Sequence, residues 1–285
     1  MSVLRESESI VHHTSHKDAL VKILRNEQFK VNYCSERIYV DRVRSVNIAV
    51  PMVSFADIRL SDYVRVYRDS KKIEEETIAL GYYGDYAIGL TKKWARKNNI
   101  YPVSYVSKPE SHIEVADNYV LKDLMPFAKV AIPWEDKGSN VEEGLPNLAS
   151  FCKHNIGYIE RNMPDSRKKR HKYAFYNEHE YRYVPSNVPV KWNFFNNGAD
   201  YNEGSNLKKR ANQALSSYLK FDLFEDVTAI VVHNDNNIEE IVKVLTKKKD
   251  EKSKGLSTEM KILLDMKFEI MLTKIITTKQ LLTEV

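Results

Sequence analysis

The chain has 285 residues, of which 42% are hydrophobic and 29% are charged. These fractions are typical of folded proteins and exclude a long disordered tail or a fibrous repeat. The formal net charge of +5 is compatible with a nucleic-acid partner but does not require one. No stretch reaches the ~18 consecutive apolar residues of a membrane span. The opening MSVLRESESI is charged where a signal peptide would be apolar. We therefore expect a cytoplasmic protein with no membrane partner.

The spacing of cysteine, histidine and glycine excludes several common site types. Cys34 and Cys152 are the only cysteines, and they are too far apart to suggest a disulfide framework or a zinc site. The eight histidines show no His-Glu-x-x-His spacing. A P-loop, a Rossmann glycine fingerprint and a Gly-x-Ser-x-Gly elbow are also missing from the sequence. We expect no metal, and nucleotide triphosphate hydrolysis and serine hydrolysis are disfavoured.

The first predicted elements are a strand or turn that ends at His13 and a helix of about three turns behind it. Leu20, Ile23 and Leu24 have the i, i+3, i+4 spacing of a buried helix face. Ser15 and Asp18 resemble a capping box for this helix.

The predicted elements up to residue 106 alternate between strand and helix. Residues 51–58 read as a half-buried strand, and residues 74–80 as a short helix. Residues 82–90 read as a turn followed by a strand. Thr91 is the expected cap of a further helix that ends near residue 98, and residues 101–106 are expected to be extended.

The second half of the chain has a basic cluster and a more regular C-terminal third. Arg167 to Arg170 are expected in a solvated loop, with a phosphate contact as the alternative. The further expected elements are strands at 129–133, 180–184, 227–232 and 275–276, helices at 207–219 and 238–245, and surface loops at 135–144 and 247–252.

The densest polar cluster contains Glu178 and Glu180, two residues apart. In an extended chain both carboxylates project from the same face, because side chains alternate with a period of two. One carboxylate could then stabilise an oxocarbenium-like centre while the other orients a nucleophile. The alternative is a structural strand in which Glu178 or Glu180 pairs with Arg182.

Two further groups are candidates for binding. His12 and His13 precede a helix N-terminus, where a histidine can donate a hydrogen bond to a ribose or a phosphate, although a structural role is the alternative. The turn around Tyr83 offers aromatic faces beside Gly84, as a base-stacking or nicotinamide-stacking site requires, or it packs in the core.

Three segments together resemble the AbiGi family of abortive phage-infection proteins. They are Pro51–Ser61, then Tyr83–Ala95 with Pro102–Val106, and finally Phe175–Pro185. The resemblance extends from about Ile10 to Val232. It implies the antitoxin half of a two-gene system, and therefore a partner: a cognate toxin or antitoxin protein, or a phage component. The family name implies no particular chemistry.

A more distant pattern is similar to the ADP-ribosyltransferase superfamily. A His13-Thr14 pair ends a first strand, a helix follows, and a late Glu-x-Glu enters another strand. This resemblance implies an α+β fold, an ADP-ribosyltransferase-like mixed sheet core with helical insertions. We expect one elaborated domain over 1–285, with 186–285 as a C-terminal α/β extension packed on the core.

The same resemblance implies roles for particular residues, with NAD as the substrate and no metal. Glu180 would be the catalytic glutamate that stabilises the developing charge on the ribose, and Glu178 would assist the acceptor. NAD would be bound by His13, Thr14, Arg182 and a central residue. That central residue is Tyr83 or Ser54, with Tyr82 as a further alternative.

Three functions follow as hypotheses. The first is a mono-ADP-ribosyltransferase that transfers ADP-ribose from NAD to nucleic acid or protein and stops the growth of the infected cell. Its test is Glu180→Gln, which should abolish transfer and leave folding nearly intact. The second is a non-catalytic antitoxin or sensor module. The third is a nucleic-acid-binding protein that uses lysine and arginine loops.

Overall fold

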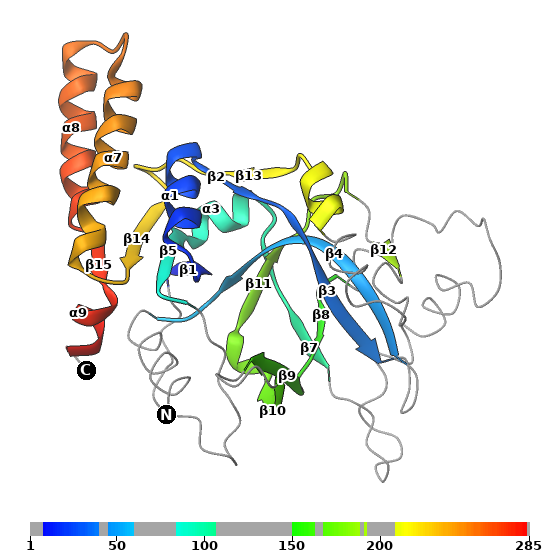
Figure 1. Cartoon of the computed structure of the whole chain (residues 1–285). Coiled ribbons are helices and arrows are strands. Elements are labelled where there is room, and N and C mark those ends of the chain that lie inside the picture. Colours follow the sequence, from blue (N-terminus) through cyan, green and yellow to red (C-terminus); the bar gives the residue numbers. More distant parts are fainter. Residues whose placement is uncertain are drawn as a thin grey trace, which may run out of the picture.

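A mixed sheet runs through the computed structural model, with helices on both of its faces (Figure 1). The structure describes residues 8–39, 45–59, 84–106, 150–162, 168–188, 191–192 and 209–283. The strands are β1 (Ser9–Thr14), β2 (Gln28–Lys30), β3 (Asn32–Tyr39), β4 (Ser45–Ala56), β5 (Tyr86–Thr91), β6 (Tyr101–Pro102), β7 (Ser104–Val106), β8 (Cys152–His154), β9 (Ile156–Asn162), β10 (Lys168–Ala174), β11 (Glu180–Tyr183), β12 (Lys191–Trp192), β13 (Tyr218–Lys220), β14 (Val227–Val232) and β15 (Ile275–Thr277). The α-helices are α1 (Lys17–Asn26), α3 (Lys92–Lys97), α7 (Ile238–Ser253), α8 (Thr258–Leu272) and α9 (Thr278–Thr283), and the 3-10 helices are η1 (Phe175–Glu178) and η2 (Asp235–Asn237).

The main sheet has the order β15-β14-β5-β1-β4-β11-β6, and β3 and β12 also pair with β4. Its described pairings are antiparallel except for β14 with β15, which is parallel. The prediction of an α+β fold with a mixed sheet is therefore confirmed. The division of the chain at residue 186 stays a prediction, although β14 and β15 from that segment are strands of the main sheet.

The core lies mainly on one face of the sheet. Leu20 and Leu24 of α1, Trp94 of α3 and Ile241 of α7 pack there in one buried cluster. A smaller cluster on the other face includes Val11 and receives Leu281 of α9. The face that each strand residue buries follows from the alternation of side chains along the strand.

The first helix is confirmed, but its predicted cap is wrong. α1 begins at Lys17 and its N-cap is His16, without a side-chain cap hydrogen bond. The Thr14 hydroxyl accepts a hydrogen bond from the His16 N–H instead, at 3.3 Å. The predicted cap at Thr91 is confirmed, because its hydroxyl accepts from the Trp94 N–H at 3.1 Å.

Four other local predictions need correction. The basic segment from Lys168 is part of strand β10, which pairs with β9, and is not a loop. The helix expected to residue 219 ends by residue 214, and residues 218–220 form β13. The lysine-rich 247–252 segment continues α7, which extends to Ser253, and α8 was not predicted. Glu178 ends η1 rather than lying in a strand, because His179 has a left-handed φ of 44° and separates it from β11.

The segments 74–80, 129–133 and 135–144 lie outside the described residues, as do Tyr82 and Tyr83. Within the described part of the chain, no helix combines the length and the apolar character that crossing a membrane requires.

Candidate functional site

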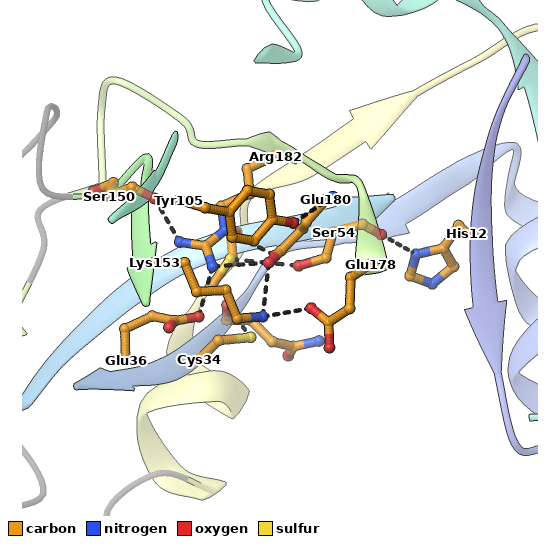
Figure 2. A network of polar contacts seen from close by, with 12 residues as sticks. His12, Cys34, Glu36, Ser54, Tyr105, Ser150, Lys153, Glu178, Glu180 and Arg182 are labelled. Carbon is orange, nitrogen blue, oxygen red and sulfur yellow. Dashed lines mark hydrogen bonds and ion pairs between the residues drawn. The ribbon is translucent and has the colours of Figure 1, made fainter. Parts of the chain in front are cut away.

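Arg182 is at the centre of a buried ion network (Figure 2). Its side chain is 0% exposed, and its Nε and Nη2 donate to the two oxygens of Glu180 at 2.8 and 3.0 Å. Nη2 also donates to Glu36 at 2.7 Å, and Nη1 donates to the Ser150 carbonyl at 2.7 Å. Every terminal nitrogen of this guanidinium therefore has an acceptor, as a buried charge requires.

Lys153 connects Glu178 to the same network. Its Nζ lies 2.6 Å from a Glu178 oxygen and 2.9 Å from a Glu180 oxygen. Glu178 comes from η1, Glu180 from β11 and Lys153 from β8. The two carboxylates are therefore close in space, but the prediction that they project from one strand face is wrong, because a shared lysine brings them together.

The network controls the charge states of its members. Burial by itself would raise the pKa of Glu180, but the adjacent Arg182 and Lys153 outweigh it and lower that pKa to about 2. For Glu36 burial prevails over the nearby Arg182, so the pKa of Glu36 is raised. Burial opposes the charge on Lys153, yet the surrounding carboxylates raise its pKa.

Tyr105 of β7 completes the surroundings of Glu180. Its hydroxyl accepts a hydrogen bond from the Glu180 N–H at 2.8 Å. Burial is the main reason that the pKa of Tyr105 is raised to about 12, so this hydroxyl stays protonated near neutral pH.

The described residues of the predicted site lie in two separate groups, one in the ion network and one around a cavity. Glu178, Glu180 and Arg182 belong to the ion network. His13, Thr14 and Ser54 line a cavity of about 550 Å³ that none of these three lines. The two groups are adjacent, because Ser54 of β4 lies opposite Arg182 of β11 in the strand register.

His12 joins the cavity to β4. Its Nδ1 donates to the Ser54 carbonyl at 2.8 Å, and its ring packs edge-on against Phe29 and Phe55. Burial lowers the pKa of His12 despite this hydrogen bond. His12 is therefore neutral near pH 7 and holds β1 to β4 through an uncharged hydrogen bond.

Sequence reasoning missed Glu36, Lys153 and Tyr105. They precede Arg182 by 146, 29 and 77 positions, as their numbers show, and no spacing rule relates them. The signal in the sequence was weak: Glu36 lies two positions after Cys34 and is followed by Arg37, and Lys153 directly follows Cys152. β3 pairs with β4 beside β11, whereas β7 and β8 form a separate pair whose side chains contact Glu180, so only tertiary contacts place these residues around β11.

The ion network engages the whole carboxylate of Glu180. Both oxygens of Glu180 already accept charged hydrogen bonds, so its negative charge is largely compensated. Among the described residues, no group of three or more histidine, cysteine or acidic side chains could hold a metal ion.

Residues 26–233 match a family model described as "Putative abortive phage resistance protein AbiGi, antitoxin". The match spans more than half of the 285 residues and includes Glu36, Ser54, Lys153, Glu180 and Arg182. The chain belongs to the AbiGi family. Neither a curated protein nor a solved structure matches it. The link to the ADP-ribosyltransferase superfamily has no support from these comparisons.

The AbiGi match ends at residue 233, before the C-terminal helices. β1 and most of α1 precede it, and α7, α8, β15 and α9 follow it. Figure 1 shows α7 and α8 as a helical hairpin that projects beyond the sheet edge formed by β14 and β15.

Proposed function

We propose that this protein is the non-catalytic antitoxin or sensor module of a two-gene abortive-infection system, and that it acts by binding a partner protein. The family description, which names an antitoxin, supports this function. The structural observation that carries it is the engagement of both Glu180 oxygens by Arg182 and Lys153.

Transfer of ADP-ribose from NAD places a different demand on this glutamate. Its carboxylate must hold the nicotinamide ribose and stabilise positive charge that develops there. A carboxylate that is already neutralised by a buried guanidinium and an ammonium group is a poor stabiliser of new positive charge. The ion network instead joins β3, β8 and β11, which is a structural role.

A partner protein requires a surface to bind, and α8 supplies one. Met260, Ile262, Leu263, Met266 and Ile270 are all between 44% and 58% exposed. Ile262, Met266 and Ile270 are spaced by four residues and form one stripe along the helix. A stripe of large exposed apolar side chains is typical of a surface that another protein covers.

Two experiments test the proposal. Deletion of the gene, with the adjoining gene intact, should arrest growth, and expression of this chain in trans should restore it. Purified protein incubated with labelled NAD and cell lysate should transfer no label. Transfer by the wild type that is lost in folded Glu178→Gln would overturn the proposal in favour of an NAD-dependent transferase.

A further inference from the structure

The cavity that contains His13 lies where β1 and β4 separate. These strands share one register pair, Val11 with Ala56. β1 then continues beside β5 as far as Thr14, whereas β4 continues beside β3 from Met52. The wedge between them is closed by α1 and β2, and its volume of about 550 Å³ is within the range of small-molecule sites.

The charged side chains among the described residues that line the cavity are all basic. None of the described residues that line it is acidic, whereas Lys22 of α1 and Lys30 of β2 both line it. Neither lysine forms an ion pair with any residue in the described ranges. The acid closest to Lys30 in sequence, Glu27, is directed to α7, where it pairs with Lys252 at 2.7 Å. The acid closest to Lys22 in sequence is Asp18, on the exposed part of the first turn of α1, and it does not line the cavity.

An aromatic ring and several neutral polar groups complete the lining. Tyr218 of β13 is 43% exposed and lies opposite Lys30 in the strand register. Thr14, Asn32 and Ser54 supply hydroxyl and amide groups farther along the wall. Burial lowers the pKa values of His12 and His13, so both rings are neutral hydrogen-bonding groups at pH 7.

We propose that this cavity binds a nucleoside phosphate, with the phosphate at Lys22 and Lys30 and the base against Tyr218. Two ammonium groups that have neither an ion pair nor a competing carboxylate among the described residues favour an anionic group. An exposed tyrosine beside them offers a flat face for a base. The remaining hydroxyl and amide groups suit a ribose. This inference does not rest on the proposed antitoxin function, because it concerns residues outside the ion network and outside α8.

The test is calorimetric titration of the purified full chain with ADP, adenosine, pyrophosphate and NAD. ADP should bind, adenosine should bind at least tenfold more weakly, and Lys22→Gln or Lys30→Gln should each weaken ADP binding by about tenfold. Lys93→Gln is the matched control, because Lys93 is an exposed lysine on α3 that does not line the cavity. It should leave binding unchanged.

A second pair of variants tests the aromatic contact. Tyr218→Phe should retain ADP binding, whereas Tyr218→Ala should weaken it about tenfold. Tighter binding of NAD than of ADP would identify a dinucleotide as the ligand. Absence of ADP binding to the folded wild type, or equal binding by the wild type and the Lys22→Gln/Lys30→Gln double variant, would overturn the inference. Because purified protein is used without a partner, neither result depends on the antitoxin function.

Discussion

Arg182 binds both carboxylate oxygens of Glu180 from a position two residues farther along the same strand. Side chains two residues apart in a strand lie on the same face, so β11 brings this pair together by its own geometry. The pair is buried, and Glu36 and Lys153 extend it to two other strands. It therefore joins three segments that are distant in the sequence.

Glu180→Gln should destabilise the protein, in contrast to the expectation from sequence that folding stays nearly intact. Removal of one partner leaves the buried Arg182 and Lys153 with one fewer carboxylate, and breaking a buried pair costs about 3–5 kcal/mol. Chemical denaturation measures the change in unfolding free energy. Glu239→Gln is the control, since its ion pair with Lys243 is exposed and should contribute nothing measurable. Equal stability of both variants would show that the network is not structural.

His13 should make stability depend on pH between about 6.5 and 3. Burial and the neighbouring His12 lower the pKa of His13 to about 3, whereas an unfolded histidine titrates near its ordinary value of about 6.5. The unfolded chain therefore takes up the proton first, and stability is lost as the pH falls through this window. The loss is at most about 1.4 kcal/mol per pH unit for this residue.

The same measurement separates His13 from Glu180. Glu180 contributes stability that is lost only below about pH 4.5, as the pH approaches its pKa of about 2. Between pH 6.5 and 5, His13→Gln should therefore flatten the profile, while His16→Gln, at an exposed position, should not. Unchanged slopes in His13→Gln would contradict the lowered pKa.

Gly84→Ala should be more destabilising than Gly255→Ala. Both glycines have positive φ, 86° and 79°, so both variants carry similar backbone strain of about 1–3 kcal/mol. A Cβ at residue 84 would also lie 2.5 Å from the Thr14 carbonyl oxygen, whereas a Cβ at residue 255 meets nothing within 4 Å. The difference in Tm between the two variants measures the destabilisation caused by the clash with Thr14. Similar Tm values would show that the backbone of β1 can shift at Thr14 without loss of stability.

Under the proposed antitoxin function, Met266→Lys should abolish restraint of the partner protein and leave stability unchanged. Met266 is 58% exposed in the middle of the α8 stripe, so a lysine there costs the isolated protein little but interrupts an apolar contact. Growth of cells that carry the two-gene locus measures restraint, and Lys261→Gln on the same helix is the control. If wild type sediments as a dimer that Met266→Lys dissociates, the stripe pairs two copies of this chain and the proposed toxin contact is wrong.

Several features could be predicted from interactions between residues close in the sequence. Thr91 could be recognised as a cap because its hydroxyl bonds to a backbone group only three positions away. The pairing of Glu180 with Arg182 was available as an alternative because their separation of two is itself a geometric relationship. α8 was missed because apolar side chains occur around most of its circumference, so the sequence has little amphipathic period.

The ion network and the cavity could not be predicted, because they depend on contacts between segments far apart in the sequence. Glu36, Lys153 and Arg182 are brought together by strand pairings and side-chain contacts between segments far apart in the chain, and no spacing in the sequence encodes those contacts. The same holds for the cavity, which exists because β1 and β4 separate after one pair. Residue types and short-range spacing specify which side chains can carry charge or cap a helix. Whether a carboxylate is free or neutralised depends on long-range contacts, which only the folded chain contains.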